Sequence, residues 1–188
     1  MMSPLLLYRS LGLLLLALFG LLTLPSARAQ TAELAADVYP GSNQWGSVNS
    51  SLPQYLTVYD GKLYFRANTA ATGSELFVYD SATGEASLAA DVYAGTDQWG
   101  NINSSSPQHL TVYGGKLYFS ANTATTGYEL FVYDSATGEA SLAADVYAGT
   151  DQWGNINHSS PQNLTVYGGK LYFSANTATT GYELFVYD

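Results

Sequence analysis

Short runs of alternating hydrophobic and polar residues, separated by glycine-containing turns, recur along the chain. Residues 116–121 alternate in this way, which is the period-two pattern of a β-strand with one buried face. Residues 110–113 form a second β-prone run, and Gly114 and Gly115 lie between the two runs. A Gly-Gly pair is typical of a two-residue type I′ turn. The stretch therefore predicts an antiparallel hairpin.

Two further strands are predicted directly after this hairpin. Residues 129–133 are apolar without alternation, which indicates a strand covered on both faces. Asp134 and Gly138 then fit a tight turn, because Asp caps its own backbone and Gly tolerates a positive φ. The next strand is expected over residues 139–147, with one face formed by Ala140, Leu142, Ala144 and Val146.

This four-strand pattern occurs three times. The motif LAADVY begins at Leu34, Leu88 and Leu142, a period of 54 residues. A fixed period of this size is typical of repeated supersecondary units. We therefore expect an all-β domain over residues 30–188, built from three four-stranded antiparallel repeats over residues 34–87, 88–141 and 142–188. The second and third repeats differ at only two shared positions, Ser104/His158 and His109/Asn163.

Strand alternation also predicts where the loops lie. Both glycine-rich hairpin turns of a repeat must lie at one end of its sheet, and the two longer polar loops must lie at the other end. Loops carry binding functions more often than the scaffold does. The polar-loop end is therefore the expected working face.

Three stretches carry a resemblance to a known family: Gly61-Lys-Leu-Tyr-Phe65, Glu75-Leu-Phe-Val-Tyr-Asp80 and Leu34-Ala-Ala-Asp37. With their copies, they resemble the blades of kelch-like β-propellers and, more closely, the bacterial Glu-Leu-Trp-x-x-Asp-Gly-Thr repeat proteins. The chain departs from that motif at Phe77, Phe131 and Phe185, where the family has Trp. The resemblance implies extracellular β-propeller-type blades and no catalytic residues.

The phase of the repeats raises the question of closure. The pattern begins with a fourth strand at residues 30–39 and ends with a third strand. We expect residues 30–39 to supply a closing fourth strand, as in propellers whose first strand completes the last blade. Because propellers have about four to eight blades, four arrangements remain open: a homodimer completing a six-bladed ring, a fragment of a larger propeller, a β-trefoil-like three-fold unit, or an open stack.

The N-terminus predicts secretion. An apolar run follows Arg9, and Ala27-Arg28-Ala29 is a small-residue cleavage site, so residues 1–29 are interpreted as a signal peptide. The run is short for a membrane span of about 20 residues. We expect a secreted, periplasmic or cell-surface protein with no membrane insertion after cleavage.

Charge narrows the choice of partners. Residues 30–188 hold all 15 acidic residues but only Lys62, Arg66, Lys116 and Lys170 as basic ones. Nucleic-acid binding requires clustered basic residues, so it is not expected. An acidic surface permits calcium. The chain has no cysteine and therefore no disulfide framework.

The only tryptophans are Trp45, Trp99 and Trp153, one at the same place in each long loop. Amide side chains flank them. An indole face beside amides suits a carbohydrate, because the ring stacks on C–H groups while amides bond to hydroxyls. The alternative is that each Trp packs between repeats. The candidate ligand-binding set is Trp45, Trp99, Trp153, Gln98, Gln152, Asn101 and Asn155.

Asp97 and Asp151 are weak candidate calcium ligands in these loops. Calcium needs about six to eight oxygen ligands, and the spacing matches no EF-hand loop. Capping of turns is the alternative role for these aspartates. We expect no other cofactor.

No catalytic motif accompanies these features. The two histidines, His109 and His158, lie at different positions of their repeats, and no nucleophile or phosphate-loop motif is present. The sequence predicts a non-catalytic binding or surface module with a carbohydrate or cell-surface partner. Two alternatives remain: a structural or adhesive array that assembles through sheet edges, and a truncated non-catalytic part of a propeller enzyme.

Overall fold

A computed structural model of the chain describes residues 31–188. The predicted signal peptide, residues 1–29, lies outside the described residues. One compact unit extends from Leu34 to Asp188. The described residues form eleven strands and no helix, so the all-β prediction is confirmed for them. In this part of the chain no helix is of a length and apolarity that would cross a membrane.

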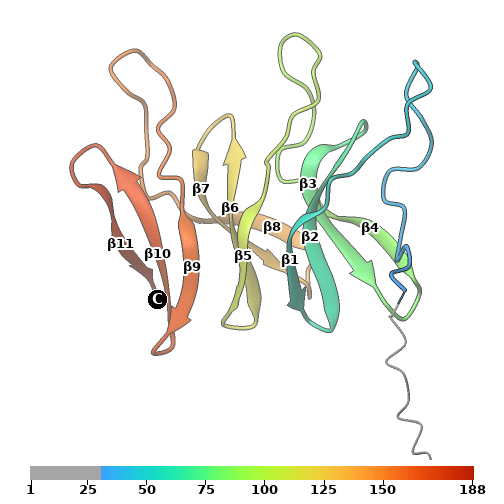
Figure 1. Ribbon diagram of the computed structural model, residues 1–188. Coiled ribbons are helices and arrows are strands. Elements are labelled where there is room, and N and C mark those ends of the chain that lie inside the picture. Colours follow the sequence, from blue (N-terminus) through green and yellow to red (C-terminus); the bar gives the residue numbers. More distant parts are fainter. Residues whose placement is uncertain (1–30) are drawn as a thin grey trace, which may run out of the picture. The chain divides into compact units, whose positions relative to one another are not determined.

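The strands form three separate antiparallel sheets (Figure 1). Each sheet takes consecutive strands in chain order, and in the first two sheets the last strand runs across the predicted repeat boundary, at residues 87/88 and 141/142 respectively. The first contains β1 (Gln54–Tyr59), β2 (Lys62–Thr69), β3 (Gly73–Asp80) and β4 (Glu85–Ala90). The second contains β5 (Gln108–Tyr113), β6 (Lys116–Thr123), β7 (Gly127–Asp134) and β8 (Glu139–Ala144). The third contains β9 (Gln162–Tyr167), β10 (Lys170–Thr177) and β11 (Gly181–Tyr187).

The predicted hairpin turns are confirmed. Gly114 and Gly115 have φ of 56° and 76°, so both take the positive φ that a type I′ turn requires. The amide of Ala136 donates to Asp134 Oδ1 at 2.9 Å, which is the cap expected of Asp in the next turn. Turn chemistry and strand alternation therefore explain where each sheet folds back on itself.

The fourth strand differs from the prediction because it contains a bulge. Leu130 pairs with Ala144 while Phe131 pairs with Leu142, so Ala143 is an extra residue. An extra residue reverses the alternation on one side of the bulge. Ala143 consequently packs against the core, whereas Leu142 is partly exposed. The predicted single face containing Ala140, Leu142, Ala144 and Val146 is therefore wrong, and the strand ends at Ala144 rather than Tyr147.

The expected closing strand at residues 30–39 is not formed. Its described part, residues 31–39, contains no strand, and Val38 packs against Phe65 and Phe77 of the first sheet. The third sheet consequently has three strands, with β11 at its edge. The three sheets do not close into a ring within the chain. A β-trefoil-like barrel would require strands paired between the three sheets, whereas each named strand pairs only with its neighbours in the chain, within one sheet.

The hydrophobic core lies between neighbouring sheets. Strand β1 lies next to β5, and β5 lies next to β9. Leu76 of the first sheet packs with Leu110 and Phe119 of the second. Leu130 of the second sheet packs in the same way with Leu164 and Phe173 of the third. Each repeat therefore buries its apolar side chains largely against its neighbour.

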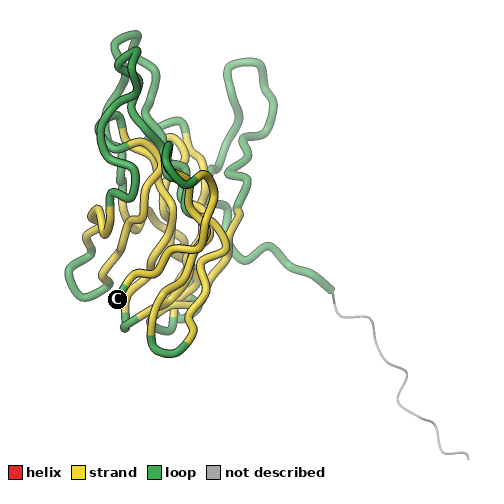
Figure 2. The backbone as a smooth tube through the Cα atoms, turned by 90° about the vertical axis from the view of Figure 1, so that its left-hand side faces the viewer, coloured by secondary structure: helices red, strands yellow, loops and turns green. Residues whose placement is uncertain are grey.

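The loop arrangement follows the prediction. The three long loops project from one end of the sheets, while the β1–β2, β5–β6 and β9–β10 turns lie at the other end (Figure 1). Figure 2 shows the same loops extending beyond the strands. The tryptophans therefore lie at the end that the sequence marks as the working face.

Candidate functional site

Each tryptophan lies in a narrow loop with two paired arms. In the second repeat, Thr96 and Ile102 form an antiparallel bridge, and the Asn103 amide donates to the Gly95 carbonyl at 3.0 Å. The other loops have the same bridge, Ser42–Val48 and Thr150–Ile156. Backbone hydrogen bonds between the two arms therefore give each loop a defined shape.

An aspartate or asparagine organises the tip of each loop. Asp97 Oδ1 accepts the amides of Trp99 at 2.9 Å and Asn101 at 2.8 Å. Asp151 accepts the equivalent amides in the third repeat. In the first repeat Asn43 Oδ1 accepts the Trp45 amide at 3.0 Å. This local side-chain bonding is the turn-capping chemistry of Asp and Asn.

The tryptophan rings face solvent. Trp45 is 80% exposed, and Trp99 and Trp153 are each 77% exposed. The alternative in which these rings pack between repeats is therefore wrong. Gln98 and Gln152 are exposed beside them. Three exposed indoles on backbone-paired loops form the candidate site, which we call the tryptophan loops (residues 41–49, 95–103 and 149–157).

Asn101 and Asn155 contribute to the shape of these loops. The Asn101 side-chain amide donates to Asp97 Oδ2 at 2.8 Å, and Asn155 donates to Asp151 at 2.9 Å. These bonds, with the backbone amides, hold the pKa of Asp97 and of Asp151 below the usual range. The structure thus brings each Asp together with an Asn predicted for the same site.

The candidate calcium ligands are not grouped with other carboxylates. Asp97 and Asp151 lie in different loops, and each carboxylate already accepts hydrogen bonds from its own loop. Within residues 31–188, no cluster of three or more His, Cys, Asp or Glu side chains is positioned to hold a metal. Calcium binding stays a prediction.

A buried glutamate holds the base of the second loop. Glu75 Oε1 accepts the Ser105 amide at 2.6 Å, and Oε2 accepts the Ser105 hydroxyl at 2.5 Å and the Val92 amide at 2.9 Å. Val92 and Ser105 are the two stems of the loop that carries Trp99. Glu75 thus ties both stems to strand β3.

The third loop has the same anchor. Glu129 accepts the Val146 amide at 2.8 Å and the Ser159 amide at 2.7 Å, and it accepts the Ser159 hydroxyl as well. Both glutamates and both serines are fully buried. These positioning residues were not predicted. The only sequence signal for them is the recurrence of a Glu and, 30 residues later, a Ser in consecutive repeats.

Burial determines the acidity of these glutamates. Loss of solvation raises the pKa of Glu75 to about 7, although three hydrogen bonds from Ser105 and Val92 favour the ionised form. Burial raises the pKa of Glu129 for the same reason. Desolvation of a carboxylate without a nearby cation has this direction in general. Both groups therefore change charge nearer neutral pH than an exposed glutamate does.

The histidines lie at contacts between repeats. His109 is half-buried with its ring 5.6 Å from that of Tyr55, and burial lowers its pKa. His158 Nδ1 accepts the amide of Tyr128 at 2.9 Å. These contacts give both side chains a packing role at the boundary between neighbouring sheets.

The site combines exposed aromatic and amide groups with buried carboxylates. Its exposed groups are indole faces with neighbouring amides, and its buried carboxylates bind the protein's own backbone. Comparison of the chain with protein-family models, curated proteins and solved structures finds no match. The resemblance to propeller-type repeats thus stays a prediction.

Proposed function

We propose that the chain is a secreted, non-catalytic binding module that recognises carbohydrate through its tryptophan loops. One observation carries the proposal: the three tryptophans of the sequence occupy equivalent tips of three loops at one end of the sheets, each 77–80% exposed. A soluble protein gains nothing from exposing a large indole three times unless the ring contacts a partner, because burial of such a ring is favourable. Isolated exposed apolar residues are common, but a repeated one at a loop tip supports binding.

Carbohydrate is the ligand class that this chemistry favours. The indole face stacks on the C–H face of a sugar ring, and the neighbouring Gln98 and Gln152 amides bond to hydroxyl groups as donors and acceptors. The acidic composition, with 15 Asp and Glu residues against 6 Lys and Arg, disfavours polyanions. A neutral glycan is the proposed partner.

The loop structure supports affinity by limiting the entropy lost on binding. The paired arms and the Asp97 or Asp151 cap fix the backbone before any ligand arrives. A site that is already ordered loses less conformational entropy when it binds. Three similar loops on one chain would also allow several units of one polysaccharide to bind together, which raises the apparent affinity.

The three sheets are further proposed to be β-propeller-type blades. Their first strands β1, β5 and β9 are neighbours, and each sheet packs its apolar face on the next. This is the order expected when blades are arranged around an axis, with the first strand innermost. The working face would then be one rim of the blades.

A glycan array provides the test. Protein expressed from the 188-residue sequence is labelled and applied to the array, and neutral oligosaccharides should give signal. The Trp99→Ala/Trp153→Ala variant should lose that signal by about tenfold or more, since exposed aromatic contacts dominate such interfaces.

A conservative pair provides the control. Trp99→Phe/Trp153→Phe keeps an aromatic face and should retain part of the binding. Absence of any glycan signal, or equal signal from the alanine variant, would show that the tryptophan loops do not bind carbohydrate.

A further inference from the structure

Equivalent residues form the interface between the first and second sheets and the interface between the second and third sheets. Leu76 and Leu130 are each fully buried against the next sheet. The Thr57 hydroxyl donates to the Leu110 carbonyl at 3.1 Å, and the Thr111 hydroxyl donates to the Leu164 carbonyl at 3.2 Å. Together with the anchors at Glu75 and Glu129, these contacts define one interface that the chain uses twice.

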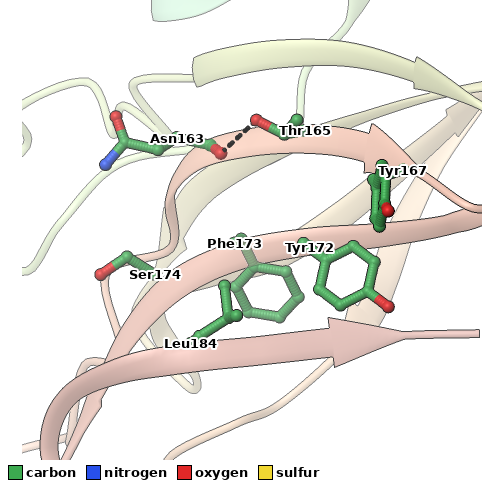
Figure 3. Close-up of a pocket in the computed structure, with 7 residues that line it drawn as sticks. All are labelled: Asn163, Thr165, Tyr167, Tyr172, Phe173, Ser174 and Leu184. Carbon is green, nitrogen blue, oxygen red and sulfur yellow. Dashed lines mark hydrogen bonds between the residues drawn. The ribbon is translucent and has the colours of Figure 1, made fainter.

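The third sheet presents one half of this interface to solvent. Leu184, the counterpart of Leu76 and Leu130, is 74% exposed, whereas they are 0% exposed. Tyr167 is 75% exposed, compared with 5% for Tyr59. Glu183, the counterpart of the buried anchors, is also exposed. Leu184, Tyr167 and Tyr172 line a hollow of about 430 Å³ on this face. Figure 3 shows these side chains.

The first sheet presents the other half. Leu56 is 58% exposed, whereas its counterparts Leu110 and Leu164 are each 9% exposed. A second hollow, of about 170 Å³, lies on this face and is lined by Leu56, Leu63, Tyr79 and Val38 among others. Val38 packs there as Val92 packs in the interface between the first two sheets. We call this surface the head face and the open surface of the third sheet the tail face.

We propose that a second copy of this chain docks its head face on the tail face, reproducing the internal interface. The repeat period assigns the contacts. Glu183 of one copy accepts the amides of Val38 and Ser51 of the other, as Glu75 accepts those of Val92 and Ser105. Leu184 is covered by Leu56 and Leu63.

The same docking supplies a fourth strand to the third sheet. Residues 34–36 correspond to residues 88–90, which end strand β4 and pair with β3 in the first sheet. On a second copy, Ala36 falls opposite Leu184 and Leu34 opposite Phe185. The edge of β11 is otherwise unpaired among the named strands, and open strand edges favour addition of a strand. This explains why residues 31–39 form no strand within their own chain.

A second copy fits these faces better than an unrelated protein because the two faces are halves of one interface in a near-identical repeat. The contact joins different surfaces of the two copies, so it is head-to-tail. Such contacts form a closed ring if the rotation closes and a longer chain of copies if it does not. Both products contain the same interface.

Two charge-introducing variants test the proposal. Leu184→Arg blocks the tail face, and Leu56→Arg blocks the head face; both side chains are exposed in the single chain, so neither change should disturb folding. By sedimentation velocity, the wild-type protein should have at least twice the mass of one chain. Each variant alone should sediment as one chain.

The equimolar mixture is the distinctive measurement. It retains one intact head–tail pair, so it should form a two-chain species and nothing larger. Leu142→Arg is the matched control, because Leu142 is 41% exposed although its sheet has neighbours on both sides; it should associate like wild type. A wild-type protein that stays a single chain at all concentrations, variants that associate normally, or a mixture that stays single would each overturn the proposal.

Discussion

Glu75, Glu129 and Glu183 occupy one position in three nearly identical repeats, yet their environments differ. The first two are fully buried and each accepts three hydrogen bonds, whereas Glu183 is exposed. The local sequence around the last two is the same, Gly-Tyr-Glu-Leu-Phe-Val-Tyr-Asp. The neighbouring repeat, rather than the local sequence, therefore determines whether this carboxylate is buried.

Burial of Glu75 predicts that stability depends on pH. Its pKa rises from 4.5 to about 7 on folding, so the folded state binds the proton more tightly. The contribution of Glu75 to the free energy of unfolding should be complete below about pH 4.5 and should fall as the pH rises to 7, by at most about 3 kcal/mol. Urea titrations followed by circular dichroism at several pH values measure this change.

Burial raises the pKa of Glu129 and of Asp91 as well, so both groups add to the fall in stability with rising pH. Hydrogen bonds lower the pKa of Asp80, Asp97, Asp134 and Asp151, so their contributions are lost only as the pH falls below the usual aspartate range. Glu75→Gln should flatten the fall between pH 4.5 and 7 and destabilise the fold by about 1–3 kcal/mol, because its amide opposes one backbone donor. Glu139→Gln, at an exposed position, is the control. A steeper fall in Glu75→Gln would contradict the assignment.

The tryptophan loop is an element whose shape depends on one side chain. In the second repeat, Asp97 accepts the amides of Trp99 and Asn101 and the Asn101 side chain. Asn43 at the equivalent position also accepts two amides, those of Trp45 and Ser47. All three loops thus have a side-chain oxygen at the tip that accepts backbone amides, and this oxygen does not need to be charged.

Asp97→Ala should loosen the second loop without unfolding the sheet. Amide hydrogen exchange at Trp99 and Asn101 should become faster, while exchange in β5–β8 stays unchanged, because the loop is exposed and opens locally. Asp97→Asn should behave like wild type, since the first repeat uses Asn there. Unchanged exchange at Trp99 in the alanine variant would mean that the backbone bridge alone holds the loop.

The second sheet contacts the next repeat closely at Gly127, the first residue of β7. A Cβ added at Gly127 would lie 2.2 Å from the backbone oxygen of Asn157, whereas one added at Gly181 meets nothing within 4 Å. Both residues have a φ of 69°, so both substitutions carry the same backbone strain. The difference in stability between the two alanine variants therefore measures the effect of the close contact with the next repeat.

Gly127→Ala should therefore cost several kcal/mol more than Gly181→Ala, which should cost about 1 kcal/mol from backbone strain alone. Denaturant unfolding in the Leu184→Arg background, where copies do not associate, gives this comparison. Equal losses of stability would show that the neighbouring repeat can move away from Gly127.

Local sequence determines some of these elements and not others. Turn residues such as Gly114, Gly115 and Asp134 determine the hairpins locally, and the 54-residue period determines the number of sheets. The bulge at Ala143 is not predicted, although the apolar run Leu142-Ala143-Ala144 interrupts the alternation at that point. The anchors at Glu75 and Glu129 are not predicted either, since their burial depends on a neighbour. The sequence allows the tryptophans to be either exposed or packed between repeats. The three-dimensional arrangement of the sheets determines which of the two occurs.

The whole molecule combines a repeated surface with a repeated interface. The interface places equivalent loops side by side, and the buried glutamates link the bases of the second and third loops to the preceding sheet. The tryptophans are thus presented in a fixed order by contacts that recur from repeat to repeat. Docking of further copies would lengthen this row and add binding sites for the same polysaccharide.

The most direct test of this account measures how glycan affinity depends on the number of tryptophan loops. Isothermal titration calorimetry, with the glycan that gives the strongest array signal, would compare wild type with variants lacking one, two and three of Trp45, Trp99 and Trp153. Affinity should fall by about tenfold for each tryptophan replaced by Ala, with unchanged thermal stability because the rings are exposed. Undiminished affinity in the variant that lacks all three would contradict the account.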